Sequence, residues 1–182
     1  LSPSMQNAAF EATGLDGGYV AFRIEPHLLQ RAIEGFRAIN LSGLNVTMPH
    51  KIAVMKHLDE VDSSALTIGA VNTIVNSDKR LIGYNTDGAG ALAALREGGF
   101  NPEWRRILIL GAGGAARALA FSLAPLAAKV VLLNRTSSKA IRLSREARQA
   151  TGAAVEGKRL TEKTLAKEMA LADLLINATS VG

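Results

Sequence analysis

The sequence predicts an α/β protein built from two α/β domains. Short apolar runs rich in β-branched residues alternate with longer segments of helical periodicity along the whole chain. In the first half, the runs Thr73 to Val75 and Leu81 to Tyr84 flank a polar segment, which indicates a hairpin and therefore a mixed sheet. In the second half, strand and helix patterns alternate strictly, which predicts a parallel sheet with right-handed crossovers.

The individual elements follow from periodicity and from the residues that begin and end them. Helices are predicted near Ser4 to Thr13, Pro26 to Ile39, Thr86 to Gly98, Gly113 to Leu123, Ser137 to Ala150 and Thr161 to Ala170. Strands are predicted at Tyr19 to Ile24, Leu44 to Thr47, Asn72 to Asn76, Leu81 to Tyr84, Ile107 to Leu110, Val130 to Leu133 and Leu174 to Ile176. The chain divides after Asp87 into a first domain, residues 1–87, and a second domain, residues 88–182, which opens with a linker helix at 88–98.

The composition indicates a globular chain without a membrane segment or a metal site. With 182 residues, 48% of them hydrophobic, the chain is long enough to bury a substantial core. No apolar run approaches the roughly 20 residues of a membrane helix, and the N-terminus lacks a charged region followed by an apolar stretch. The absence of cysteine excludes disulfides and thiolate metal sites, and the three scattered histidines lack zinc-ligand spacing. We therefore expect a soluble, cytoplasmic protein without a metal.

The positive charge lies mainly on the second half. Residues 1–100 carry 8 Lys and Arg against 10 Asp and Glu, whereas residues 101–182 carry 13 against 6. A basic half is typical of nucleic-acid binding, but only 4% of the residues are aromatic, and none are interleaved with the arginines. A small anionic ligand therefore fits better than a nucleic acid. The oligomeric state is left open between monomer and homodimer.

A glycine-rich turn lies near the start of the second domain. The apolar run Arg106 to Leu110 leads into the run Gly111 to Ala115, and an alanine-rich helix follows. This order of strand, tight glycine turn and helix is typical of a dinucleotide site, where the free N–H groups and the dipole of the helix N-terminus attract a pyrophosphate. The turn alone is also compatible with a strand-to-helix connection that binds nothing.

The residues about 20 positions beyond this turn indicate which dinucleotide binds. NAD sites place Asp or Glu there, to accept hydrogen bonds from the ribose 2′-hydroxyl. Here Asn134, Arg135 and Thr136 occupy the place, and Lys139 follows. Arg135 can pair with a 2′-phosphate in a bidentate fork, while Thr136 and Lys139 can add donors. The segment therefore favours NADP over NAD, the alternative being a solvated helix start.

Three polar residues of the first domain lie near the ends of short strands. Lys51 follows a strand that Pro49 ends, and it is predicted to begin a helix. Asn72 and Asp87 each lie beside a predicted strand end as well. Because ligands bind at the carboxyl edge of an open α/β sheet, an ammonium, an amide and a carboxylate would meet there to hold hydroxyl groups and move a proton. Singly, Asp87 could be a helix N-cap, Asn72 a turn residue and Lys51 a solvated surface group.

Seven short motifs, in this order, resemble the shikimate dehydrogenase family over the whole chain. They are Ser2-Pro3, Asn45 to Lys51, Gly69 to Thr73, Asn85 to Gly88, Gly111 to Ala115, Asn134 to Thr136 and Asn177 to Ser180. The resemblance implies an oxidoreductase of aromatic amino-acid and chorismate biosynthesis that reduces 3-dehydroshikimate to shikimate with NADPH. It implies that Lys51 and Asp87 form the catalytic pair, and that Ser2, Thr47 and Asn72 hold the substrate with them. The residues assigned to NADP are Gly111, Ala112, Gly113, Gly114, Ala115, Asn134, Arg135, Thr136, Lys139 and Thr179.

The chain departs from the family pattern at both ends. It begins at Leu1 with only the second serine, Ser2, of a paired Ser-x-Ser motif, and it stops at Gly182 within the cofactor loop. We therefore expect a fragment in which both domains are incomplete, without the first strand and without the C-terminal segment that lines the nicotinamide.

Three other functions share part of this pattern. A quinate/shikimate dehydrogenase that uses NAD is expected to carry an acidic residue near the ribose, where Arg135 stands. A folate-type dehydrogenase with a similar two-domain layout fits the other motifs less well. A non-catalytic regulatory module that binds the dinucleotide and the substrate would keep both pockets, but it would not need Lys51 and Asp87.

Overall fold

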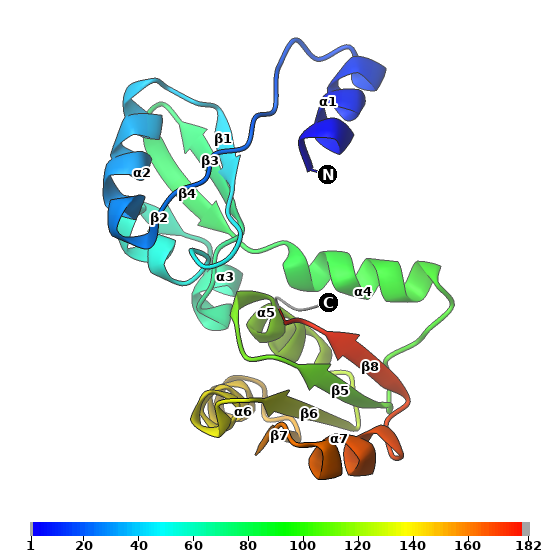
Figure 1. Cartoon of the computed structure of the whole chain (residues 1–182). Helices are drawn as coiled ribbons and strands as arrows, with labels where there is room; N and C mark the ends of the chain where they lie inside the picture. Colours follow the sequence, from blue (N-terminus) through cyan, green and yellow to red (C-terminus); the bar gives the residue numbers. More distant parts are fainter. Residues whose placement is uncertain (1, 180–182) are drawn as a thin grey trace.

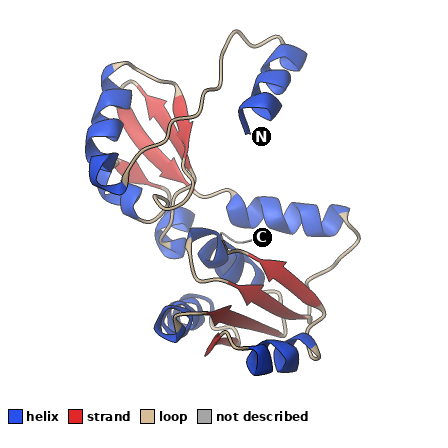
Figure 2. Cartoon of the chain, in the orientation of Figure 1, coloured by secondary structure: helices blue, strands red, loops and turns tan. Residues whose placement is uncertain are grey.

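The protein contains two separate β-sheets, with a long helix, α4, between them (Figure 1). The structure is a computed structural model, and it describes residues 2–179. The first sheet has the strand order β1-β3-β4-β2, and the second has the order β7-β6-β5-β8. Helices lie against both sheets (Figure 2). The predicted α/β class with two α/β units is thereby confirmed.

The element bounds are as follows. The helices are α1 (Ser2–Thr13), the 3-10 helix η1 (Pro26–Leu28), α2 (Leu29–Ala38), the 3-10 helix η2 (Ala53–His57), α3 (Ser63–Ile68), α4 (Asp87–Glu97), α5 (Gly114–Leu123), α6 (Ser137–Thr151) and α7 (Glu162–Met169). The strands are β1 (Gly43–Asn45), β2 (Glu60–Val61), β3 (Thr73–Ser77), β4 (Arg80–Tyr84), β5 (Arg106–Leu110), β6 (Lys129–Asn134), β7 (Val155–Arg159) and β8 (Leu174–Asn177).

The first sheet is mixed, as the sequence predicts. Strands β3 and β4 form the expected antiparallel hairpin, β1 pairs antiparallel with β3, and β2 pairs parallel with β4. The register places Asn45, Thr73 and Tyr84 side by side. Because β3 runs opposite to its neighbours, the end of β1, the start of β3 and the end of β4 meet at one edge. The loops that carry the polar residues of the first domain therefore begin at the same place.

The second sheet is entirely parallel, which is also as predicted. Side chains alternate between the two faces of a strand, so β5 supplies both layers of the core. Ile107 and Ile109 belong to the cluster that contains α5, whereas Leu108 packs on the other face with Leu160 and Leu165. Burial on both faces explains why this strand is a continuous apolar run.

The strand predicted at Tyr19 to Ile24 is wrong, because this stretch is an extended segment outside any sheet. The side chain of Asn7 on α1 takes the place of a neighbouring strand at Tyr19. Asn7 Nδ2 donates to the Tyr19 carbonyl at 3.0 Å, and the Tyr19 amide donates to Asn7 Oδ1 at 2.7 Å. A β-branched pattern predicts extended backbone, but pairing requires a free neighbouring strand.

Three elements were not predicted, for local reasons. β2 has two residues and α3 has six, so neither contains a full period of a pattern. The edge strand β7 contains a glycine and three charged residues, and its Glu156 pairs with Lys129 of β6 at 2.6 Å. In β7, ion pairs replace the alternation of apolar residues that would have predicted a strand.

Helix α4 packs with the second domain rather than the first. Its Ala91, Leu92 and Leu95 lie against the core cluster of that domain. A Cβ at Gly88 would overlap the Ser122 hydroxyl on α5, so only glycine allows the two helices this approach. These contacts agree with a boundary after Asp87, which stays a prediction. Among residues 2–179, no helix is both long and apolar enough to cross a membrane.

A carboxylate is buried beneath the second sheet. Glu168 of α7 is 1% exposed, and it accepts hydrogen bonds from Lys158 Nζ at 2.8 Å and from Arg106 Nη2 at 2.7 Å. The Lys158 ammonium, followed by the Arg106 guanidinium, holds the pKa of the Glu168 carboxyl below its usual 4.5, although burial opposes this shift. A carboxyl with a lowered pKa stabilises the fold above its ordinary pKa, and the contribution is lost as the pH falls through the lowered value.

We expect Glu168→Gln to lower the free energy of unfolding by about 2 kcal/mol at neutral pH. Breaking a fully buried ion pair costs roughly 3–5 kcal/mol, and here both cations are partly exposed. The difference from wild type should shrink as the pH falls from the ordinary carboxyl pKa of 4.5 through the lowered pKa of Glu168, because the wild-type carboxyl then becomes protonated. Urea unfolding at neutral and at acidic pH measures the difference in the free energy of unfolding. Glu162→Gln, at an exposed position on the same helix, is the control. Equal stability at neutral pH would contradict the assignment.

Candidate active site

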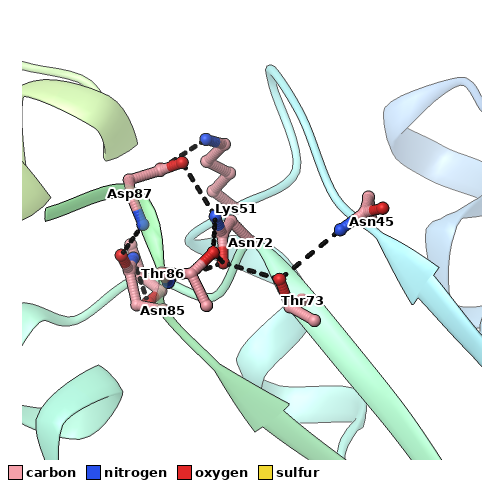
Figure 3. Close-up of polar contacts among 8 residues, drawn as sticks. Asn45, Lys51, Asn72, Thr73, Asn85, Thr86 and Asp87 are labelled. Atoms are coloured by element: carbon pink, nitrogen blue, oxygen red, sulfur yellow. Dashed lines mark hydrogen bonds and ion pairs between the residues drawn. The ribbon is translucent and has the colours of Figure 1, made fainter. Parts of the chain in front are cut away.

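Lys51 and Asp87 form an ion pair at the edge of the first sheet (Figure 3). Lys51 Nζ lies 2.5 Å from Asp87 Oδ2, and the two side chains are only 14% and 24% exposed. Lys51 lies in the turn after Pro49, and the helix predicted to begin at Lys51 is instead the 3-10 helix η2, which begins at Ala53. The Val71 amide donates to the Lys51 carbonyl at 2.8 Å and fixes this turn on the sheet. Lys51 is therefore a partly buried, paired ammonium and not a solvated surface group.

Asn72 is the third polar residue beside Lys51 and Asp87, and its neighbours determine the orientation of its amide. The backbone N–H of Thr86 can only donate, and it lies 3.0 Å from Asn72 Oδ1. The hydroxyl of Thr73 also donates to this oxygen, at 3.0 Å. Asn72 Nδ2 is thereby turned towards Asp87 Oδ1, to which it donates at 2.8 Å. The ammonium, the amide and the carboxylate meet as the sequence predicts.

Asp87 is the first residue of α4 and not its N-cap, which is Thr86. The N–H of Asp87 is held by Asn85 Oδ1 at 3.1 Å, while Asn85 Nδ2 donates to the Ala70 carbonyl at 2.9 Å. A negative charge in the first turn is stabilised by the helix dipole. The carboxylate of Asp87 therefore accepts hydrogen bonds from Lys51 and Asn72 rather than capping its own helix.

Sequence reasoning missed a chain of hydrogen bonds that extends away from Asn72. Asn45 Nδ2 donates to the Thr73 hydroxyl at 3.4 Å, and the Tyr19 hydroxyl donates to Asn45 Oδ1 at 3.2 Å. Asn45 is the first residue of one recognised motif and Thr73 the last residue of another, so the motifs themselves were the available signal. Tyr19 has no local signal, because it lies 26 residues from its partner.

Ser2 and Thr47 lie beside a cavity of about 420 Å³ in the first domain. The cavity is bounded by α1, the extended segment at 18–24, β1 and α2, and its lining is mainly apolar. Lys51, Asn72 and Asp87 are not among its lining residues, although Asn45 and Thr47 connect it to their sheet edge. The structure thus brings Ser2 and Thr47 to one cavity but does not bring them into contact with the Lys51–Asp87 pair.

The glycine turn of the second domain forms as predicted between β5 and α5. Gly111 has φ +115°, and a Cβ there would lie 2.8 Å from the Ala178 carbonyl, so the position requires glycine. Gly113 is the N-cap of α5, and no atom lies within 4 Å of the place where its Cβ would be. Open space before a helix N-terminus with free N–H groups fits a pyrophosphate. Ala112 and Ala115, also predicted for the cofactor, belong to the same turn and helix start.

The turn also contacts the ion pair of the first domain. A Cβ on Gly114 would lie 2.9 Å from Lys51 Cβ and 3.1 Å from Lys51 Cδ. The absence of a side chain at Gly114 therefore lets the start of α5 rest against the stem of Lys51. This contact brings the predicted cofactor turn directly to the predicted catalytic pair.

The basic residues predicted for a 2′-phosphate lie after β6. Arg135, Thr136 and Lys139 are exposed, and Asn134 Nδ2 donates to the Thr136 carbonyl at 3.0 Å. The donor set suits a phosphate, and the stretch 134–139 contains no carboxylate. Thr179 follows β8, whose residue Asn177 pairs in register with Leu110 just before the glycine turn. Ser180, the last residue of that motif, lies outside the described residues.

Comparisons with known proteins agree with this geometry. The family model described as the shikimate dehydrogenase substrate binding domain matches residues 1–74. The NADP(+) shikimate dehydrogenase of Moorella thermoacetica is 49% identical over 183 residues, covering 100% of this chain and 62% of the relative. Over its whole length, the chain is similar to this shikimate dehydrogenase. It spans somewhat less than two thirds of the length of this relative.

Solved structures of the shikimate dehydrogenase fold match over both domains. The Thermus thermophilus enzyme in complex with NADP(H) and shikimate superposes with a TM-score of 0.83 at 38% identity, covering 100% of this chain and 64% of that one. The quinate dehydrogenase of Corynebacterium glutamicum in complex with NAD has a TM-score of 0.82 at 30% identity, covering 97% and 65%. The fold alone therefore does not distinguish the two activities.

Within residues 2–179, no group of three or more His, Cys, Asp or Glu side chains is placed to hold a metal ion.

Two glycine substitutions in the turn should have different effects. Gly113→Ala adds a methyl group in open space, so we expect weaker NADP binding, by about tenfold, with unchanged shikimate binding. Gly114→Ala adds one against Lys51, so we expect it to weaken both ligands and to lower kcat. Calorimetric titration of each ligand on both variants measures the difference. Equal changes in the affinities of both ligands in the two variants would show that the contact between Gly114 and Lys51 does not affect function.

Proposed function

We propose that this protein is an NADP-dependent shikimate dehydrogenase, an oxidoreductase that reduces the ring ketone of 3-dehydroshikimate to the hydroxyl of shikimate. The observation that carries the proposal is the approach of Gly114, in the dinucleotide turn, to the stem of Lys51, which is paired with Asp87. The similarity to relatives named for this activity supports it. The proposal places the enzyme in the cytoplasm, as a monomer or homodimer with small-molecule partners.

Lys51 is the proposed proton donor. NADPH, when bound, supplies the hydride to the ring carbonyl carbon. Negative charge then grows on the carbonyl oxygen, where the Lys51 ammonium can stabilise and protonate it. Asp87 holds the ammonium in place with a charge-assisted hydrogen bond of 2.5 Å. In the opposite direction, Lys51 accepts the proton from the substrate hydroxyl.

Asn72, Thr47 and Ser2 are the proposed substrate-binding residues, together with the catalytic pair. Asn72 is held by Thr73 and Thr86, so its amide is pre-oriented before any ligand binds. Thr47 and Ser2 lie at the cavity beside the same sheet edge, where their hydroxyls can serve a carboxylate or a ring hydroxyl.

Arg135 is the proposed determinant of NADP preference, with Thr136 and Lys139 as further donors and Asn134 holding the segment. We expect Arg135→Ala to weaken NADP(+) binding by about 10- to 100-fold, since a hydrogen bond to a charged group contributes roughly 1.5–3 kcal/mol. NAD(+) binding should change less than about twofold, because NAD lacks the 2′-phosphate. Fluorescence titration with both dinucleotides measures this, and Arg148→Ala at the far end of α6 is the control. Equal losses for both dinucleotides would defeat the assignment.

An absorbance assay at the NADPH band tests the function, with shikimate and quinate each combined with NADP and with NAD. Activity with shikimate and NADP supports the proposal. A preference for quinate and NAD would instead indicate a quinate/shikimate dehydrogenase. Tight binding of NADP and shikimate without turnover would indicate a non-catalytic regulatory module.

A further inference from the structure

Arg117 joins three helices at the contact between the two domains. Its side chain leaves α5 and is only 14% exposed. Its Nε donates to the Ile68 carbonyl on α3 at 2.6 Å, and its Nη1 pairs with Glu146 on α6 at 2.5 Å. The guanidinium carbon also lies 5.5 Å from the ring centre of Phe121. A single side chain of the second domain is therefore bonded to the first domain and to the helix that follows Arg135.

Gly69 makes room for this guanidinium. Ile68 ends α3, so its carbonyl lies at the negative end of the helix dipole, where a cation is favoured. Gly69 then ends the helix with φ +72°, and a Cβ at this position would lie 2.7 Å from Arg117 Nη2. Glycine is thus required here for its conformation and for the space it leaves to Arg117.

The segment that follows Ile68 carries the active site. Three residues further on, the Val71 amide donates to the Lys51 carbonyl at 2.8 Å, and the next amide, of Asn72, donates to the Tyr84 carbonyl at 3.0 Å. Ile68 and Ala70 are buried in the core cluster of the second domain, although they belong to the first. Arg117 therefore anchors the beginning of a short, well-bonded segment whose end holds Lys51 and Asn72.

The other end of the arrangement is the cofactor turn. Arg117 lies one helical turn after Gly113, and its own amide donates to the Gly113 carbonyl at 2.9 Å. Its partner Glu146 lies on α6, which begins two residues after Arg135. The path from the proposed phosphate-binding residues to Lys51 therefore runs along α6 to Glu146, through the Arg117 guanidinium, and from the end of α3 to Val71.

We propose that Arg117 is a positioning residue that sets the distance between the Lys51–Asp87 pair and the dinucleotide turn, and hence the distance of hydride transfer. The inference rests on the proposed dehydrogenase function. A misplacement of about 1 Å between reacting groups can lower a rate by about 100-fold, so a rigid connection between the two domains is valuable here. Arg117 is hydrogen-bonded on both sides of the connection, to the Ile68 carbonyl of the first domain and to the Glu146 carboxylate of the second, which suits a fixed link better than a mobile one.

Arg117→Met retains the stem and removes both connections, so it is the principal variant. We expect kcat to fall about 10- to 100-fold, while KM for either ligand changes less than about threefold. The primary deuterium isotope effect with NADPH deuterated at the transferred position should rise, because hydride transfer becomes rate-limiting. A variant that is merely less stable would lose active enzyme without changing this isotope effect. Arg142→Met is the matched control, because Arg142 also faces Glu146, at 3.7 Å, but is 71% exposed.

A distance measurement tests the link independently of turnover. The sequence has no cysteine, so nitroxide labels can be placed with Lys56→Cys in the first domain and Gln149→Cys on α6, both at exposed positions. Double electron–electron resonance should give one narrow distance distribution for the parent protein and a broader one with Arg117→Met. The Arg142→Met distribution should match the parent.

The outcomes separate the two proposals. Inactivity of the full-length parent protein defeats the proposed function, and the label distances then decide the role of Arg117 alone. Active parent protein with an unchanged isotope effect and unchanged distances in Arg117→Met overturns the positioning role. If Arg117→Met does not fold, Glu146→Gln decides, since it retains the bond to Ile68 and removes the ion pair. A smaller change in the same direction, about threefold in kcat, supports the role, and parent-like behaviour overturns it.

Discussion

Lys51→Ala is expected to lower kcat by about 1,000-fold and to change KM for shikimate by less than about fivefold. Acid–base catalysis by a positioned side chain typically contributes 10²- to 10⁴-fold. The charge that Lys51 would stabilise is present mainly in the transition state, so its loss should affect kcat far more than ground-state binding. Steady-state kinetics in both directions measure this result.

Lys51 also packs against α5, so the loss of its stem must be separated from the loss of its ammonium. Lys51→Met retains methylene groups over Gly114 and removes the charge. We expect it to lose as much kcat as Lys51→Ala but to retain more of the NADP affinity. Lys56→Ala removes an exposed lysine from the neighbouring helix η2 and should leave both parameters unchanged. A loss confined to KM would reduce Lys51 to a substrate-binding role.

Asp87→Asn is expected to damage both parameters, lowering kcat by about 100-fold and raising KM for shikimate by about tenfold. In the wild-type protein, each oxygen of the Asp87 carboxylate accepts from a donor, one from Lys51 and the other from Asn72. An asparagine has the same shape, but its NH₂ group must face one of these two donors. Either the catalytic ammonium would lose its acceptor, or the Asn72 amide, which Thr73 and Thr86 hold in place, would face a donor. Kinetics together with urea unfolding measure the effect, since stability should change little at this partly exposed pair.

Asp59→Asn is the matched control for this variant. Asp59 also pairs with a cation, Arg37, at 2.6 Å, but its carboxylate accepts its other hydrogen bond from the Leu81 amide and none from Lys51 or Asn72. Its loss should leave kcat and KM unchanged. Asp87→Asn with kcat within threefold of wild type would remove Asp87 from the proposed mechanism.

Most of the second domain could be predicted from the sequence, because its parallel sheet is buried on both faces. Burial on both faces produces continuous apolar runs such as Ile107 to Leu110, and glycines mark the turn that follows. The edge strand β7 was missed because it contains a glycine and three charged residues, whose ion pairs replace an apolar pattern. In the first domain, the hairpin was recognisable from its turn, but the segment at Tyr19 was wrongly assigned as a strand, because side-chain bonds to Asn7 replace strand pairing.

The features of the candidate site also fall into those that the sequence determined and those that depend on the tertiary structure. The sequence alone determined which kinds of residue the site contains, because these are chemical properties of single positions. They include an ammonium at Lys51, a carboxylate at Asp87, and a cation at Arg135 where NAD sites carry an acid. The tertiary structure decided which groups meet. The turn of Asn72 towards Asp87, the contact of Gly114 with Lys51 and the bond from Arg117 to Ile68 join residues that lie 15, 63 and 49 positions apart. Such contacts depend on how two sheets and a bridging helix pack, and no local pattern of spacing records that packing.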